Sequence, residues 1–191
     1  MSTPVLSTRE RLVRAATSIA AREGLAAATT AAIADRAGVA EGTLYRHFPS
    51  KDELLIAAYR DMKNRVFIQA AEGVDTSLPP PDRLKRMWRA IYDAYREDPD
   101  AFLFGMRFAE SGLEKKEGGE AARAIGKMVT DLRRDGVASG DFRKLPADLL
   151  GNLFLAPISS LLKSELKGRR WTDAELNAAA EAVLAGWRSQ D

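Results

Sequence analysis

Apolar residues recur every three or four positions along most of the chain, which is the period of an amphipathic helix. The first such segment opens with Ser7 and Glu10, whose three-residue spacing is that of a capping box. Leu12 and Ile19 then lie on one face, and Gly24 follows as a residue that ends helices. We therefore expect a helix between Ser7 and Gly24.

Residues 30–54, TAAIADRAGVAEGTLYRHFPSKDEL, predict two short helices, a tight turn and the start of a third helix. Either Thr29 or Thr30 can cap the first of these helices. Gly38 stands where the chain must reverse, and residues 41–48 form the next helix. A small residue is needed at such a turn, because two helices that meet at about 90–120° leave little room. The pattern is that of a helix-turn-helix.

Beyond residue 50 the helical period continues, interrupted by stretches rich in glycine and proline. The clearest linker is GVDTSLPPP, residues 73–81, after which Asp82 is expected to cap a new helix. A polar loop is expected at residues 111–119, and Gly136 and Gly140 are expected to frame a turn. The helices expected between these breaks are one from Ser50 to about Gly73, one from Asp82, one after Asp98-Pro99, one over about 120–135, one from Pro146 to Gly168 and one after Thr172. No stretch alternates with the period of a strand, so the expected fold is all-α with about nine helices.

The amino-acid composition is that of a globular protein and excludes several kinds of site. Of the 191 residues, 46% are hydrophobic and 29% are charged, as in a globular domain with a sizeable core. Without cysteine, disulfides and thiolate zinc sites are excluded. No signal peptide and no run of about 18 apolar residues is visible, so the expected location is the cytoplasm. The net charge is only +2, but residues 1–51 carry seven Lys or Arg against four acidic residues.

The helix over residues 41–48 carries the candidate chemistry. Leu44 is expected to face inward, whereas Thr43, Tyr45 and His47 can donate to phosphate oxygens. Arg46 is the best candidate for reading a base edge, because a guanidinium pairs with guanine in a bidentate way. His47 is the single histidine, and without a second histidine or a cysteine a metal site or a catalytic base is disfavoured.

These motifs together resemble the TetR-type family of bacterial transcriptional regulators. The matching residues are Thr30, Ile33-Ala34, Ala37-Gly38-Val39, Gly42-Thr43-Leu44-Tyr45, His47-Phe48, Ser50-Lys51 and Glu53-Leu54. The resemblance implies an N-terminal three-helix DNA-binding domain, residues 1–52, and a helical ligand-binding and dimerisation domain, residues 53–191. It also implies a homodimer formed through the last two long helices, about 146–167 and 172–188, and operator DNA and a small, mostly apolar effector as partners. No cofactor, metal or membrane partner is implied.

The resemblance also assigns DNA contacts to particular positions. They are Thr30, Ala40, Glu41, Gly42, Thr43, Tyr45, Arg46, His47 and Lys51. Lys51 opens a helix, where free amides and the helix dipole favour a phosphate. Ala40 stands where a serine is common in the family, which removes one hydroxyl contact. Glu41 repels phosphate unless it accepts a hydrogen bond from a cytosine amino group.

Aromatic, Met and isolated polar residues of the middle helices are candidates for an effector pocket. They are Trp88, Tyr92, Phe102, Met106, Arg107, Met128, Asn152 and Phe154. Ordinary core packing is the alternative for the aromatic and Met residues. Arg107 and Asn152 can equally be satisfied core groups or surface residues.

The segment from Pro146 to Gly168 is apolar on more than one side. Its leucines, together with Phe154 and Ile158, nearly encircle the helix, which must then be covered on several faces. A partner subunit that packs the same two helices against their copies would cover it. A helix central to its own domain is the alternative.

The main hypothesis is a dimeric repressor that binds a pseudo-palindromic operator and is released by a small molecule. A second hypothesis is a helical enzyme that acts on a small apolar substrate, but no nucleophile–base pair or metal cluster is evident. A third is an architectural DNA-binding protein without an effector, which predicts sequence-independent binding and no pocket.

Overall fold

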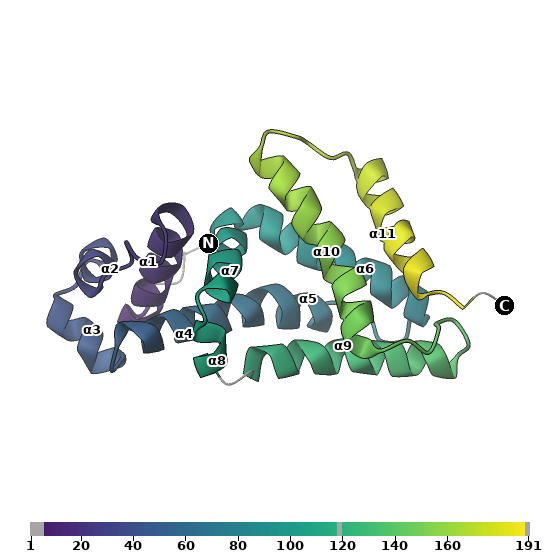
Figure 1. Ribbon diagram of the computed structural model, residues 1–191, viewed down its shortest axis with the longest axis horizontal. Helices are drawn as coiled ribbons and strands as arrows, with labels where there is room; N and C mark the ends of the chain where they lie inside the picture. The colour runs from purple at the N-terminus through teal and green to yellow at the C-terminus, as the bar shows by residue number, and fades with distance from the viewer. Residues whose placement is uncertain (1–5, 118–119, 190–191) are drawn as a thin grey trace. The chain divides into compact units, whose positions relative to one another are not determined.

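The computed structural model describes residues 6–117 and 120–189, and most of these residues are helical (Figure 1). The elements are, in chain order, α1 (Thr8–Glu23), α2 (Thr30–Ala37), α3 (Glu41–His47), α4 (Lys51–Lys63), the π-helical segment η1 (Asn64–Ile68), α5 (Gln69–Glu72), α6 (Pro80–Glu97), α7 (Pro99–Glu110), α8 (Leu113–Glu117), α9 (Glu120–Ala138), α10 (Ala147–Leu166) and α11 (Asp173–Trp187). Within these ranges there is no strand, and one isolated bridge joins Phe142 to Arg188. The predicted all-α fold is confirmed.

The chain divides into two compact units. The first consists of Met1–Asn64 and Asp98–Ala121, and the second of Arg65–Glu97 and Ala122–Asp191. Helices α7 and α8 thus fold with α1–α4, although they follow α6 in the chain. The functional division into residues 1–52 and 53–191 stays a prediction.

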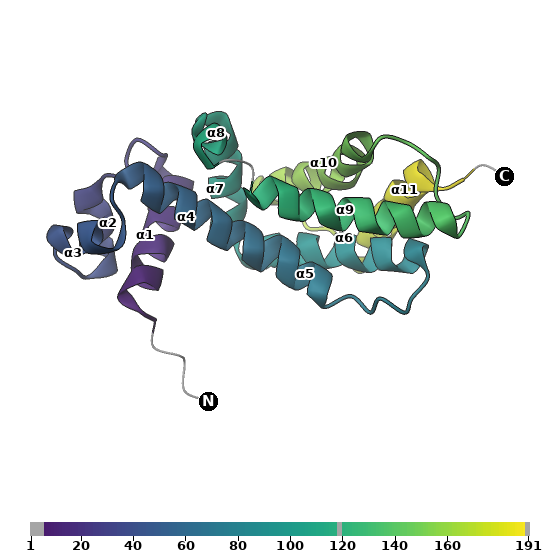
Figure 2. The same cartoon turned by 90° about the horizontal axis from the view of Figure 1, so that it is seen from below.

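The first unit packs around α1. Leu12 of α1 is fully buried with Ile33, Leu44 and Leu54, one from each of the next three helices. Figure 2 shows α2 and α3 gathered with α1 beside the first turns of α4. The ring of Phe108 on α7 stacks on Tyr59 of α4, with centroids 4.2 Å apart and nearly parallel planes. Helix α7 is therefore part of the core that holds the helix-turn-helix.

The second unit has an aromatic core. Trp88 and Tyr92 of α6, Phe154 of α10 and Trp187 of α11 are all fully buried. The Trp88 indole donates to the carbonyl of Phe154 over 3.1 Å, which satisfies its one polar group. Helices α10 and α11 lie side by side and run antiparallel (Figure 1).

Several predicted boundaries were wrong. Helix α6 begins at Pro80, not at Asp82, because the amides of a first helical turn have no intrahelical partner and proline costs little there. The amide of Asp82 instead donates to the Pro79 carbonyl over 3.0 Å. The loop expected at residues 111–119 contains the short helix α8, and the long helix expected before Gly73 is divided by η1.

The expected role of Gly136 was also wrong, because this residue lies inside α9. A Cβ at Gly136 would stand 2.0 Å from Cδ2 of the Phe142 ring, so the glycine lets the ring approach the helix. The turn is made by Gly140, whose φ of +83° is in the left-handed region.

Candidate nucleic-acid interface

The turn between α2 and α3 depends on Gly38. Its φ of +66° and ψ of +42° are left-handed, a conformation that glycine adopts without strain. The amides of Gly38 and Val39 donate to the carbonyls of Asp35 and Ala34 over 2.9 and 3.0 Å. The last carbonyls of α2 are thereby satisfied, and the chain is turned into α3.

Helix α3 presents one polar face to solvent. Leu44 is buried on the opposite face, whereas Tyr45 is 53% exposed and Arg46 and His47 are exposed beside it. The Tyr45 side chain is large and aromatic, and because its own unit does not cover it, it is available to an outside partner. The predicted inward position of Leu44 is confirmed.

Two cationic side chains stabilise this arrangement from neighbouring elements. Arg11 of α1 donates from Nη1 to the carbonyl of Ala37, at the end of α2, over 3.1 Å. Lys51 donates from Nζ to the carbonyl of Leu25, which follows α1, over 3.2 Å. Lys51 was expected to contact phosphate, and its ammonium keeps two further donors for that role.

A third cation, Arg107 of α7, donates from Nη1 to the carbonyl of Ala20 over 2.9 Å. Ala20 lies in the last turn of α1, where carbonyls lack intrahelical N–H donors. The contact ties α7 to α1 inside the first unit. It gives no support to the predicted role of Arg107 in effector binding.

Thr30 and Glu41, both predicted DNA contacts, are bonded to each other. The Thr30 hydroxyl donates to Oε1 of Glu41 over 2.6 Å and so joins the first residues of α2 and α3. The cap of α2 is Thr29, whose hydroxyl accepts from the amide of Ala32 over 3.2 Å. No sequence signal identified the Thr30–Glu41 pair, because helical periodicity does not relate residues across a turn.

The predicted effector residues fall in two groups. Trp88, Tyr92, Met128, Asn152 and Phe154 belong to the second unit, where the first two rings stack with centroids 5.9 Å apart. Met128 is half-buried and Asn152 is exposed. The predicted pocket residues of the second unit are therefore brought together only in part.

The other three predicted effector residues belong to the first unit. Phe102 is buried there, Met106 is half-buried, and Arg107 makes the contact with α1 described above. All three lie on α7, the helix that packs on α1. Their role in effector binding stays a prediction.

Tyr92 is the most unusual polar group in the second unit. Burial, and after it the Glu165 carboxylate, raises the pKa of its phenol far above the ordinary value. Within the described residues its hydroxyl makes no hydrogen bond of good geometry. A buried donor without a partner is costly and is a natural contact for a polar atom of a ligand.

Helix α10 carries three leucines at the surface, and one of them lines a hollow between α10 and α11. Leu149, Leu153 and Leu166 are 44%, 41% and 48% exposed. A hollow of about 330 Å³ between the two helices is lined by Leu153, Pro157, Ser160, Leu161, Ala179, Ala182, Val183 and Gly186. Exposed leucines around an apolar hollow are typical of a surface that another chain covers.

Neither a metal cluster nor a membrane helix was found in the described part of the chain. Within residues 6–117 and 120–189, no group of three His, Asp or Glu residues could hold a metal ion. Among the helices of those same ranges, none is long and apolar enough to cross a membrane.

Comparison with known proteins agrees with this geometry. The chain matches bacterial regulatory proteins of the tetR family over residues 12–58 and the tetracyclin repressor-like C-terminal domain over residues 79–189. Over 148 residues it is 31% identical to the HTH-type transcriptional repressor KstR2 of Mycolicibacterium smegmatis. The aligned region covers 75% of this chain and 72% of that protein.

Solved structures share the fold over nearly the whole chain. A TetR family protein of Vibrio parahaemolyticus superimposes with a TM-score of 0.82 at 26% identity, covering 96% of this chain and 100% of that one. The regulator FadR of Bacillus subtilis, solved in complex with stearoyl-CoA, gives a TM-score of 0.77 at 19% identity, covering 92% and 95%. The helix-turn-helix of the first unit and these matches show that the chain belongs to the TetR family of bacterial transcriptional regulators.

Proposed function

We propose that this regulator is a cytoplasmic repressor whose dimer binds a pseudo-palindromic operator and releases it when a small molecule binds. The observation that carries the proposal is the two-faced helix α3, which buries Leu44 and exposes Tyr45, Arg46 and His47. In a helix-turn-helix the second helix enters the major groove. In the proposed complex Tyr45 and His47 donate to phosphates, and Arg46 reads a guanine.

The proposed dimer contact is the face of α10 and α11 around the hollow, where Leu153 of α10 is exposed. Packing this face against its copy gives an isologous four-helix contact and buries apolar surface that the single chain leaves in water. Two heads in such a dimer would engage half-sites about 34 Å apart, or a multiple of that distance. Leu153, 41% exposed at the edge of the hollow, is the residue to test. Leu153→Glu is expected to convert the dimer to monomer in sedimentation velocity.

The proposed effector is mostly apolar with a polar part. The aromatic side chains of Trp88, Tyr92 and Phe154 would contact the apolar portion, and the Tyr92 hydroxyl, which makes no hydrogen bond of good geometry, would turn from the Glu165 carboxylate to an oxygen of the ligand. Stearoyl-CoA, the ligand of the Bacillus subtilis FadR structure, combines these two kinds of group and is the first molecule to test. A ligand that binds only the folded state raises the melting temperature. Thermal-shift assays with stearoyl-CoA, free stearate and free coenzyme A would separate the contributions of the two parts.

The DNA-binding proposal is tested with a duplex selected from a random pool by the full-length protein. Fluorescence anisotropy should show Tyr45→Ala weakening binding to this duplex about ten-fold, while the far-ultraviolet spectrum of the protein is unchanged. Arg170→Ala, which removes an exposed cation of the second unit, is the matched control and should bind as the wild type does. Equal affinities for wild type and Tyr45→Ala would refute the assigned face.

A further inference from the structure

The hydrogen bond between Thr30 and Glu41 places a carboxylate at the start of the recognition helix. The two side chains are eleven residues apart, and the Oγ1–Oε1 distance of 2.6 Å is that of a charge-assisted hydrogen bond. A carboxylate only accepts hydrogen bonds, so the Thr30 hydroxyl is the donor. Its one proton is used in this bond and is not available to a phosphate.

The pair leaves half of the carboxylate free. Two oxygens offer about four acceptor positions, and Thr30 occupies one of them on Oε1. Glu41 is exposed, so Oε2 can meet an outside partner. Because the bond to Thr30 restricts the rotamers of Glu41, less side-chain entropy is lost when that partner binds.

The choice of partner follows from the chemistry of the major groove. The first residues of a recognition helix reach base edges, whereas a carboxylate near a phosphate is repelled. Guanine presents two acceptors in the groove and thymine presents one, so both repel Glu41. Adenine has an amino group beside the acceptor N7, and cytosine presents its amino group alone. Cytosine is therefore the base that suits an acceptor-only side chain.

We propose that Glu41 accepts a hydrogen bond from the amino group of one cytosine in each operator half-site, and that Thr30 is the positioning residue that holds its carboxylate. The inference rests on the proposed function, because it requires α3 to be the recognition helix. It reassigns Thr30 from a direct DNA contact to a residue that acts through Glu41. It also accounts for an acidic residue on a face that must approach DNA.

The experiment is selection of binding sites by full-length protein from a duplex pool with randomised half-sites, followed by sequencing. Wild type should select a cytosine at one position of each half-site, preferred about ten-fold over the other bases. Glu41→Gln should lose this preference at that position alone and favour adenine, whose N6 and N7 suit an amide. Preferences at the other positions should not change.

Thr30 variants test the positioning role. Thr30→Val should lower the cytosine preference about three-fold at the same position, and Thr30→Ser, which keeps the hydroxyl, should restore it. A phosphate contact would behave differently, because its loss weakens binding to all sequences equally. A uniform loss in Thr30→Val would therefore overturn the positioning role.

The experiment distinguishes failure of the cytosine contact from failure of the proposed function. If wild type enriches a site and Glu41→Gln selects the same bases at every position, the reading of cytosine is wrong and the proposed function stands. If wild type enriches no sequence at all, sequence-specific DNA binding fails, and the inference fails with it.

Discussion

Both compact units join their elements with cations on carbonyls and with ion pairs, but the ion pairs of the second unit concentrate on α6. In the first unit, long cationic side chains donate to carbonyls at or just beyond the ends of helices, as Arg11 does at Ala37 and Arg107 at Ala20. In the second unit Arg133 likewise donates to the carbonyl of Leu145 over 2.6 Å, and three ion pairs join α6 to neighbouring helices. They are Arg83–Asp135 at 3.0 Å between α6 and α9, and Lys85–Glu181 at 2.7 Å and Arg89–Asp173 at 2.6 Å between α6 and α11.

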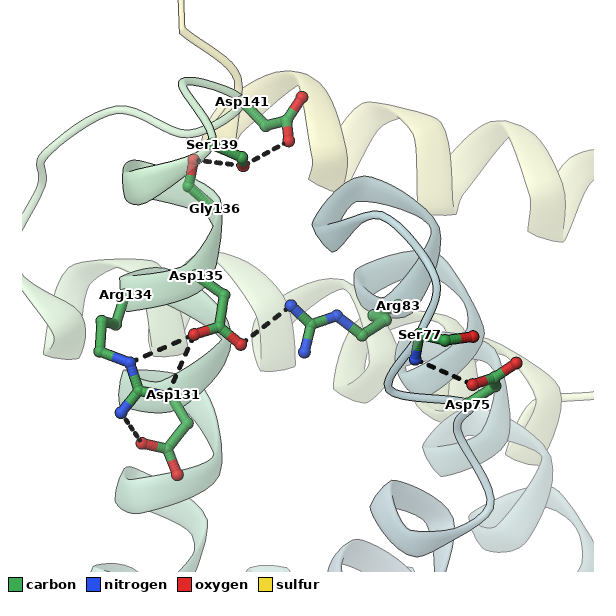
Figure 3. A network of polar contacts seen from close by, with 9 residues as sticks. All are labelled: Asp75, Ser77, Arg83, Asp131, Arg134, Asp135, Gly136, Ser139 and Asp141. Carbon is green, nitrogen blue, oxygen red and sulfur yellow. Dashed lines mark hydrogen bonds and ion pairs between the residues drawn. The ribbon is translucent and has the colours of Figure 1, made fainter.

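The two kinds of contact differ in strength. A cation on a helix-end carbonyl satisfies a group that would otherwise lack a partner, and hydrogen bonds to charged groups contribute about 1.5–3 kcal/mol. Exposed ion pairs contribute about 0–1 kcal/mol and can exchange partners. Asp135 already contacts both Arg83 and Arg134 (Figure 3). We expect the ion pairs of α6 to contribute less to stability than the contacts of Arg11 and Arg107 at the ends of helices.

The largest expected effect concerns the packing of the Phe142 ring against Gly136 in the second unit. Gly136→Ala would place a methyl group against the Phe142 ring, and the overpacking should cost about 3 kcal/mol of unfolding free energy. Gly126→Ala in the same helix meets no atom within 4 Å and should stabilise by up to about 1 kcal/mol. Urea unfolding of both variants measures the contrast. Equal changes in the unfolding free energy of the two variants would show that the Phe142 ring does not pack closely against α9.

The next effect tests the end contacts of the first unit. Arg107→Met removes the donor to Ala20 and should lower the unfolding free energy by about 2 kcal/mol. Arg22→Met is the matched control, because Arg22 also joins α1 to α7 through Asp100 but its side chain is 68% exposed. It should cost less than about 1 kcal/mol. Thermal denaturation compares the two variants. Similar losses of stability would mean that the hydrogen bond to the helix-end carbonyl and the exposed ion pair do not differ in strength.

A smaller effect distinguishes two glycines of the helix-turn-helix. Gly38→Ala forces a left-handed alanine and should destabilise the first unit by about 1 kcal/mol. Gly42→Ala meets no atom within 4 Å and should stabilise α3 by up to about 1 kcal/mol, yet weaken DNA binding by adding a methyl group to the proposed interface. Chemical unfolding and anisotropy titrations read the two properties separately. Unchanged DNA affinity in Gly42→Ala would move the interface away from this residue.

The smallest effect concerns the ion pairs of the second unit. Hydrogen bonds from Arg83, and then from Arg134, hold the pKa of the Asp135 carboxyl below its usual value. A depressed pKa stabilises the folded state above the ordinary pKa of about 4, and this contribution is lost as the pH falls through the folded-state pKa. Unfolding free energies between pH 6 and pH 3 should therefore fall slightly less in Asp135→Asn than in wild type. Identical pH profiles would show that the network adds no stability.

Local sequence was sufficient for the elements whose signals lie within one helical turn. The predicted capping box at Ser7 is present, and the helices expected after Asp98-Pro99 and after Thr172 begin there with Asp98 and Thr172 as caps, because each signal lies within three positions. Gly38 was equally predictable, since few residues other than glycine adopt its left-handed conformation. The inward face of α3 followed from the helical period alone.

By itself, then, the sequence determined most of the long helices, several of their caps, the helix-turn-helix and the family to which the chain belongs. Only the tertiary structure decided where the long polar side chains go. Arg107 meets Ala20 across 87 positions, and Thr30 meets Glu41 across a turn, because the fold brings those groups together. The buried role of Gly136 arose in the same way, from the approach of the Phe142 ring. Helical periodicity reports which face of a helix is buried, but it carries no information about which distant donor and acceptor will meet.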